Sequence, residues 1–434
     1  MTSDVLPPPP PPPPPPSPFP PPSRRRWSWV LGGLLAVAVV AGVLVLVLHG
    51  SPSTNTNHRT GSHTPRSTPS SSPEGTLSGL ATLPTPAFPP GAPAPPPANA
   101  FNVTKYGADP SGQSDATQAI RQAISAAEAA GSGQTVYFPA GTYLLDDNDG
   151  LKTDFRLSGP TAPNILGAGR DTTRLVEKIG TVAYPGITKP KTVFDLSAVT
   201  GTVFSGLTVD TETFNAGDTI DDSGDNTTIE HAGFLGAQNK NTFTMRVLTV
   251  CNANPGHNLY GIHKSGNVVD DVLLRGRGKG GNDDLDFSCQ WDGKISNITD
   301  VGWGTAVYID HNVSITNFDF TPGPDETDPR GWYITNSDHI SITNFITRGQ
   351  GGVIKNPNLG SSAITVDHEQ MLQPGFVLEV GDVAGMTISN STIVQLRIDP
   401  AVSANGISIV SSKVGSVTCS PGGTITSLSG VTCA

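Results

Sequence analysis

Three aspartates and one histidine are the side chains in this sequence best suited to chemistry. They are Asp284, Asp286, Asp310 and His263. Carboxylates that lie close together without touching can divide the work of glycoside cleavage. One with a raised pKa protonates the leaving oxygen, while another activates water. We predict catalytic roles for these four residues if the fold brings them to one face. The competing interpretation is that each Asp caps backbone groups at a turn.

Aromatic and basic residues accompany this set. Tyr308 and Tyr333 offer ring faces that stack on the apolar faces of sugars. Arg275, Arg277 and Lys279 lie on a preceding loop that could reach the same place. A solvated turn explains these three equally well. In a lyase, one of them removes the proton beside a uronate carboxylate that calcium neutralises. We predict no cofactor for hydrolysis, and calcium only for a lyase.

A repeated phrase indicates what positions these side chains. Residues 313–318 read VSITNF and residues 340–345 read ISITNF, and Asn recurs at 297, 317, 344 and 390. The gaps are 20, 27 and 46 residues, the last close to two repeats of 23. Short alternating strands at such a period predict the coils of a parallel β-helix, each stabilised by its neighbours.

The coil period converts sequence spacing into position, because neighbouring coils lie about 4.8 Å apart. We align four strands with Ile262, Phe287, Ile309 and Ile334 pointing inward, which gives steps of 25, 22 and 25 residues. The outward residues then form two columns, Gly261, Asp286, Tyr308 and Tyr333 in one and His263, Ser288, Asp310 and Thr335 in the other. This register predicts that Asp286 and Asp310 share one face.

Before the repeats, apolar residues recur at helical spacing from Ala116 to Ala130, and Gly131 ends the pattern. Ser114 and Asp115 are suitable N-cap residues. We predict an amphipathic helix that covers the open hydrophobic end of the β-helix.

Three phrases surround and follow this helix in order: Lys105-Tyr106-Gly107-Ala108-Asp109, Tyr137-Phe138-Pro139-Ala140-Gly141-Thr142-Tyr143 and Gly167-x-Gly169. Together they resemble the N-terminal signature of the pectate lyase superfamily and its rhamnogalacturonase and epimerase-like domains. The resemblance implies an all-β, right-handed, single-stranded parallel β-helix that is often a carbohydrate-active enzyme. Hydrolases, lyases, epimerases and non-catalytic spikes share this scaffold.

The acidic phrase at residues 282–287, NDDLDF, resembles the Asn-Thr-Asp-Gly-x-Asp motif of polygalacturonases. It lacks the Gly, and its spacing is one residue short. The Gly-His-Gly motif of that family is absent from the sequence. A second acidic segment, Thr211 to Thr228, contains four aspartates. We interpret it as a solvated loop, with a calcium site as the alternative.

The first hundred residues have a different composition. Residues 1–26 contain an unbroken run of proline, followed by three arginines, and form a Pro-rich tail. Residues 27–48 carry no charge and are long enough to cross a bilayer. Residues 49–100, rich in Ser, Thr and Pro, form a disordered stalk before the β-helix domain at 101–434. The arginines predict a cytoplasmic N-terminus and an extracellular domain at the cell membrane. The tail is either a passive spacer or a ligand for a cytoplasmic polyproline-binding partner.

The net charge of the domain disfavours one class of partner, and its cysteines predict disulfides. Five of the 26 basic and two of the 37 acidic residues precede residue 101, so the domain carries a net charge of −14. Nucleic acid is therefore an improbable partner. All four cysteines lie in the predicted outer domain, where an oxidising compartment permits disulfides. We predict the pairs Cys419–Cys433 and Cys251–Cys289, and no zinc site.

These features predict a membrane-anchored extracellular β-helix that cleaves a polysaccharide by hydrolysis with paired carboxylates. The alternatives are a non-catalytic surface module that binds or displays cell-wall glycan, and a calcium-dependent polysaccharide lyase. The sequence does not indicate an oligomeric state.

Overall fold

The computed structural model describes twelve segments of the chain, which we call the described residues. They are residues 95–146, 153–178, 192–213, 218–237, 244–248, 263–277, 284–308, 310–323, 330–354, 361–401, 403–420 and 423–433. The predicted tail, the predicted transmembrane segment and most of the predicted stalk fall outside them. None of the helices within these segments is both long and apolar enough to cross a bilayer.

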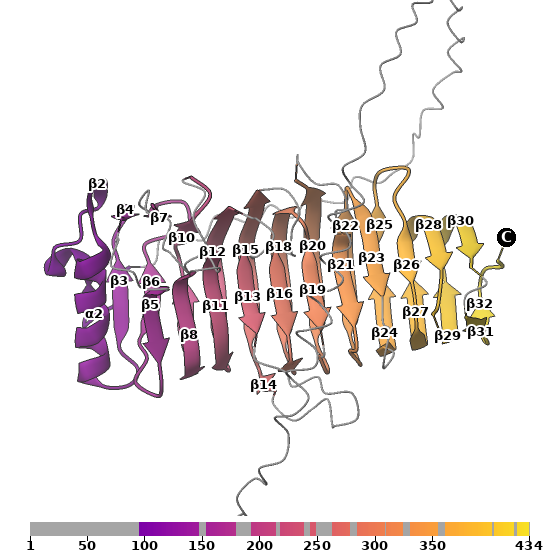
Figure 1. Ribbon diagram of the computed structural model, residues 1–434, viewed down its shortest axis with the longest axis horizontal. Coiled ribbons are helices and arrows are strands. Elements are labelled where there is room, and N and C mark those ends of the chain that lie inside the picture. Colours follow the sequence, from indigo (N-terminus) through magenta and orange to yellow (C-terminus); the bar gives the residue numbers. More distant parts are fainter. Residues whose placement is uncertain are drawn as a thin grey trace, which may run out of the picture. The chain divides into compact units, whose positions relative to one another are not determined.

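The described part of the chain is a parallel β-helix with one α-helix at its start (Figure 1). α2 (Thr117–Ala130) follows η1 (Val103–Tyr106) and buries Ile120, Ile124 and three smaller residues on one side. This buried side packs against η1 and strands from the first coils. Asp115 accepts hydrogen bonds from the backbone and hydroxyl of Thr117, which satisfies an amide at the helix start. The predicted capping helix is confirmed.

Strand pairings are all parallel and form three stacks, with each coil adding one strand segment to each stack. The first stack contains β1 (Phe101–Asn102), β3 (Thr135–Phe138), β6 (Asn164–Gly167), β9 (Val203–Ser205), the starts of β12 (Thr228–Ala237), β15 (Val268–Arg277), β18 (Lys294–Gly302), β20 (Ser314–Pro322) and β22 (Ser341–Thr347), then β24 (Ser361–Asp367), β27 (Val383–Ser389), β29 (Ser403–Val410), β31 (Thr424–Ile425) and β32 (Leu428–Ser429). The second stack contains β2 (Ser111–Asp115), β4 (Gly141–Leu145), β7 (Thr173–Glu177), β10 (Thr208–Asp210), the ends of β12, β15, β18, β20 and β22, then β25 (Gln370–Met371) and the starts of β28 (Thr392–Ile398) and β30 (Lys413–Cys419).

The third stack carries the candidate site. It contains β5 (Thr153–Ser158), β8 (Thr192–Thr200), β11 (Asp218–Asp225), β13 (Met245–Leu248), β16 (Leu285–Ser288), β19 (Thr305–Tyr308), β21 (Arg330–Thr335), β23 (Gln350–Ile354), β26 (Leu378–Val380) and the ends of β28 and β30. A separate two-stranded sheet pairs β14 (Lys264–Ser265) with β17 (Gln290–Trp291). This pattern of coils fits the expected right-handed β-helix.

The repeated asparagines occupy one bend of successive coils. Asn297, Asn317, Asn344 and Asn390 all have φ between 49° and 57°, a left-handed conformation that Asn adopts more readily than most residues. The side-chain amide of Asn317 donates to Asn297 at 2.9 Å, and that of Asn344 donates to Asn317 at 2.8 Å. His368 holds the same bend between Asn344 and Asn390, which accounts for the gap of 46 residues. The predicted coil period is confirmed.

Inward side chains stack from coil to coil along the core. Phe194 lies 5.0 Å from Phe155 and 5.0 Å from Phe204, measured between ring centroids. Farther along, Phe318 stacks on Phe345 at 4.9 Å. These aromatic contacts bind neighbouring coils to one another because no single coil can bury its apolar side alone.

The C-terminal end is closed by a disulfide. Cys419 and Cys433 are bonded, with their Cα atoms 5.5 Å apart, as predicted. Cys289 is buried and disulfide-bonded. Its expected partner, Cys251, lies outside the described residues.

Within residues 211–228, the interpretation as a solvated loop is wrong for residues 218–225. Residues 218–225 of this segment form β11, a strand of the third stack. Asp218 and Asp222 are buried inside it, whereas Asp221 and Asp225 are partly exposed on its outer side. The strand was missed because Asp218 and Asp222 occupy two of its four inward positions, which breaks the expected apolar alternation.

Candidate active site

The third stack places charged residues from successive coils in one outward column. Asp221 pairs with Arg246, and Arg246 with Asp286, across β11, β13 and β16. The column continues through Ala306 and Tyr333 on β19 and β21. Between these positions, residues such as Val247, Phe287, Val307 and Ile334 point inward and are buried. Alternation along each strand therefore turns the charged residues outward.

The predicted register is wrong by two residues at one strand. Val307, not Ile309, aligns with Phe287 and Ile334. Each side chain still points inward or outward as predicted, because a shift of two residues preserves the alternation. The shift moves Tyr308 beside Ser288 and puts Ala306 between Asp286 and Tyr333. Both tyrosines still lie on the partly exposed outer side, as predicted.

Arg246 lies between two carboxylates. Its NH1 atom is 3.6 Å from Oδ2 of Asp221, and its Nε atom is 4.0 Å from Oδ2 of Asp286. Both separations are longer than a hydrogen bond. The side chains retain 33% exposure at Asp221, 21% at Arg246 and 14% at Asp286. Two carboxylates thus flank one guanidinium and differ in their contact with water.

Burial dominates the electrostatics of Asp286. It raises the pKa of the Asp286 carboxyl above its usual range, and the Ser288 hydrogen bond and the Arg246 guanidinium offset only part of this effect. The Ser288 hydroxyl donates directly to Oδ1 of Asp286. Burial therefore favours the protonated form of the Asp286 carboxyl.

Asp284 does not face outward, so the prediction that it joins a solvent-facing catalytic set is wrong. Its side chain is fully buried and accepts hydrogen bonds from Thr244 at 2.9 Å and from the Trp303 amide at 2.8 Å. Burial raises its pKa, with a hydrogen bond to the Asp300 carboxyl acting in the opposite direction. A Cβ at Gly302 would stand 1.8 Å from the Asp284 carboxylate, so this close approach requires glycine. Asp284 anchors the junction between two coils.

Asp310 is also buried, which contradicts its predicted place beside Asp286 in the open. It lies past the end of β19, where its carboxylate accepts the Gln290 amide at 2.5 Å. Burial raises its pKa well above the usual range, and the nearby charge of Asp286 raises it further. The error follows from the register, because the outward alternation ends with the strand at Tyr308. Asp310 therefore stabilises the turn that follows β19.

His263 belongs to a different surface from Asp286. Its ring stacks on the indole of Trp291 at 3.8 Å with an interplanar angle of 12°. It directly precedes β14, which pairs with β17 outside the main sheet. The predicted column that joined His263 to the strands of the third stack is therefore wrong.

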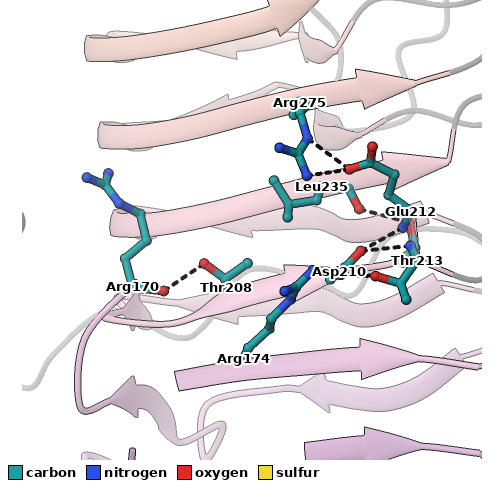
Figure 2. Close-up of polar contacts among 9 residues, drawn as sticks. Arg170, Arg174, Thr208, Asp210, Glu212, Thr213, Leu235 and Arg275 are labelled. Atoms are coloured by element: carbon teal, nitrogen blue, oxygen red, sulfur yellow. Dashed lines mark hydrogen bonds and ion pairs between the residues drawn. The ribbon is translucent and has the colours of Figure 1, made fainter. Parts of the chain in front are cut away.

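Arg275 is in the second stack and not near Asp286. Figure 2 shows its guanidinium against Glu212, with Nε and NH2 at 2.8 and 2.7 Å from one carboxylate oxygen. The loop that precedes β16 begins after a strand of another stack, so nearness in sequence does not bring Arg275 to the Asp286 side. The side chain of Arg277 and all of Lys279 lie outside the described residues.

Sequence reasoning missed Arg246 and Asp221. A usable signal existed, because Asp-x-Ser occurs at 195–197, 221–223 and 286–288. These three copies fall on the same register of the third stack, with Arg246 in the remaining coil, whereas a fourth copy at 109–111 lies outside that stack. The step from 246 to 286 is 40 residues, which hid the repeat.

Comparison with protein families agrees with this fold. Residues 100–323, just over half of the chain, match the family described as rhamnogalacturonase A/epimerase, pectate lyase-like. The chain belongs to this family. The resemblance inferred from the N-terminal phrases is confirmed, and the matched region of this pectate lyase-like protein includes β11, β13, β16 and β19.

Solved structures share the architecture at low identity. The tailspike protein of E. coli bacteriophage HK620, in complex with a hexasaccharide, is 12% identical, with a TM-score of 0.56 over 76% of this chain and 65% of its own. The A-module of Azotobacter vinelandii mannuronan C-5 epimerase AlgE4 is 15% identical, with a TM-score of 0.41 over 75% of this chain and 99% of its own. The likeness to the tailspike, at 12% identity, shows a common fold and not a common activity. No match was found among curated proteins.

Proposed function

We propose that this pectate lyase-like protein hydrolyses glycosidic bonds in a polysaccharide, with Asp286 as general acid and Asp221 as general base. The observation that carries this proposal is the outward column in which both carboxylates flank Arg246, at 3.6 and 4.0 Å. Asp221 takes the place of Asp310 as the predicted partner of Asp286, because Asp310 is buried.

The two carboxylates have the unlike environments that the two roles require. The raised pKa of Asp286 keeps its proton available for the leaving oxygen. Asp221 is more exposed than Asp286, at 33% against 14%, and the Arg246 guanidinium lies 3.6 Å from its carboxylate. Removing the proton of a water molecule needs an anionic carboxylate, so Asp221 suits the base.

The spacing favours one stereochemical course. The backbones of Asp221 and Asp286 lie two strands apart, which is about 9.6 Å at about 4.8 Å per strand, at the upper limit of the carboxyl separation that an inverting enzyme uses. Inverting glycosidases separate their carboxyls by about 6.5–9.5 Å, which leaves room for the attacking water. In this mechanism Asp286 gives its proton to the glycosidic oxygen, and water attacks the anomeric carbon as the bond breaks. Asp221 takes the proton from that water, so the product has inverted configuration.

Tyr308 and Tyr333 supply aromatic surface for a sugar beside the column. Tyr333 lies in the Asp286 column two coils away, and the Arg330 guanidinium lies 5.3 Å from its ring. Tyrosine rings near a polar site suit the apolar faces of sugars. The bacteriophage tailspike of the same fold is bound to a hexasaccharide, which supports a glycan partner for this protein.

We also propose that the domain works outside the cell, held to the membrane by residues 27–48. The support is the uncharged length of this segment and the three arginines before it. The hydrolytic mechanism requires no metal. Of the three basic residues considered as the base of a calcium-dependent lyase, Arg275 lies in another stack.

The test incubates the full chain with neutral and acidic polysaccharides, with and without calcium. New reducing ends report hydrolysis, and ultraviolet absorbance reports the unsaturated uronides of a lyase. We expect reducing ends without that absorbance, and their loss in Asp286→Asn. Calcium-dependent absorbance contradicts the proposal. A glycan retained without cleavage makes the protein a binding module instead.

A further inference from the structure

Two histidines and one aspartate meet at the turns between the third and first stacks. His311 and Asp338 pair as isolated parallel bridges, in a row that runs from Trp291 to Ser362. The His311 amide donates to the Gln290 carbonyl, and the His339 amide donates to the Ser362 carbonyl. The backbone of every member is therefore fixed by neighbouring coils. None of the three belongs to the proposed active site.

The side chains converge through the carboxylate. Nδ1 of His311 lies 2.9 Å from Oδ1 of Asp338, and Nδ1 of His339 lies 3.0 Å from Oδ2. One ligand atom from each residue lies within 4.8 Å of the others, and within the described part of the chain this is the only such group of three. His339 is 61% exposed, His311 34% and Asp338 22%, so solvent reaches the group.

Donor type and spacing match a transition metal better than a hard cation. Zinc binds imidazole nitrogen and carboxylate oxygen at about 2.0–2.2 Å in tetrahedral sites, which puts ligand atoms roughly 3.3 Å apart. The two nitrogen–oxygen separations already approach that value. Calcium and magnesium prefer oxygen ligands throughout, and two imidazoles disfavour them.

Other histidine–aspartate contacts in the described residues have one imidazole for each carboxylate, unlike the group at Asp338. His368 lies 2.8 Å from Asp367, and His231 lies 2.7 Å from Asp271, each through Nδ1. Both are pairs at a coil bend with a single imidazole. A single hydrogen bond between one histidine and one carboxylate is enough to fix such a bend. Only around Asp338 do two imidazoles share one carboxylate among the described histidines.

Neighbouring rings hold His311 in place. The ring of Trp291 lies 5.1 Å from the ring of His311, measured between centroids. The His263 ring stacks on the same indole at 3.8 Å. His339 lies 5.3 Å from His311 in an edge-on arrangement. Packing that limits the rotation of a ligand lowers the entropy cost of binding a metal.

We propose that His311, Asp338 and His339 bind a divalent transition metal of the zinc class, and that this ion joins two adjacent coils. Three protein ligands leave the fourth tetrahedral position to a water molecule. The ion stabilises the folded chain by binding it in preference to the unfolded chain, in which the three ligands do not converge.

The experiment titrates Zn²⁺ into the full chain, produced without a histidine tag, by calorimetry at neutral pH. The test variant is His339→Asn, because Asn tolerates the φ of 56° at this position. The matched control is His368→Asn, which changes an exposed histidine of equal backbone conformation that contacts Asp367 alone. Melting temperature without metal verifies that both variants fold.

We expect one ion per chain in the wild type, a dissociation constant raised at least tenfold in His339→Asn, and a change below twofold in His368→Asn. Zn²⁺ should raise the melting temperature of the wild type and the control but not of His339→Asn. The proposal is overturned if the wild type binds no Zn²⁺. It is equally overturned if the two variants bind alike, since the ion then resides on other histidines.

Discussion

The second and third stacks both combine arginine with aspartate, yet the two stacks arrange these residues differently. In the second stack, Asp210 is fully buried and accepts the amides of Glu212 and Thr213 at 2.9 and 3.0 Å, together with the Arg174 guanidinium (Figure 2). In the third stack, Arg246 stands 3.6 and 4.0 Å from two partly exposed carboxylates.

This difference indicates that the same residue types stabilise the backbone in the second stack and are suited to chemistry in the third. Carboxylates that accept several short hydrogen bonds are held in the charged form and fix the backbone. A carboxyl such as Asp286, with a burial-raised pKa and a more distant cation, keeps a proton that it can donate. The predictions below test this distinction, beginning with the largest effect.

Replacing the proposed base removes activity without harming the fold. Asp221→Asn should lower kcat about 10²–10⁴-fold, because the attacking water loses its proton acceptor. The matched second-stack variant Glu212→Gln should keep kcat within twofold, since the Arg275 contact that it disturbs lies in another stack. Reducing-end assays on both variants check this. Equal losses in the two variants would remove the distinction between the stacks.

Removing a tightly held carboxylate affects stability and not catalysis. Asp210→Ala should lower the free energy of unfolding by about 3 kcal/mol, because two backbone amides and the Arg174 guanidinium lose their acceptor. Chemical denaturation measures the change, and kcat per folded molecule should stay the same. A stability within 0.5 kcal/mol of the wild type, taken as about the scatter of surface substitutions, contradicts the structural role.

Carboxyls buried without a strong cation nearby make the fold less stable as pH rises. Burial raises the pKa of Glu369 to about 8, and that of Asp222 to about 6. The folded chain therefore holds protons that the unfolded chain has released. The contribution is fully present below the unfolded pKa near 4.5 and is lost as pH rises toward 8.

Melting curves between pH 4.5 and 8 test this effect. The melting temperature of the wild type should fall over that range, and Glu369→Gln should reduce the fall because its side chain does not ionise. Identical pH dependence in the two proteins would exclude Glu369 as a contributor.

The smallest effect is expected at an exposed pair in the same column as the site. Arg156 lies three coils before Arg246, is 66% exposed and lies 3.1 Å from Asp195. Arg156→Gln should change stability by less than about 1 kcal/mol, because solvent screens exposed pairs. It should leave kcat within twofold. A large loss of activity would extend the catalytic surface toward β8.

The coil period was predictable because it has a local cause. Each repeated Asn occupies a left-handed bend that few residues tolerate, so the repeat is visible in the letters. The register was less predictable, because alternation cannot distinguish Val307 from Ile309 as the inward residue. Tyr308 and Tyr333 still point outward as predicted, because a shift of two residues does not change the alternation.

The catalytic partners were only partly predictable. Asp286 was found, but its expected partner Asp310 lies beyond the end of β19, where alternation no longer applies. Arg246 was hidden by the 40-residue step to Asp286, which exceeds the coil period. Asp221 was interpreted as part of a loop because two of the four inward residues of β11 are aspartates, of which Asp222 accepts hydrogen bonds from Gly224 and Thr227.

The stereochemistry of hydrolysis tests the central claim most directly. With the polysaccharide that the wild type cleaves, proton NMR within the first minutes of reaction identifies the anomer formed before mutarotation. Carboxyls two strands apart predict a product of inverted configuration. A retained configuration requires carboxyls about 5–5.5 Å apart and a covalent intermediate, and would contradict the assignment of Asp286 and Asp221.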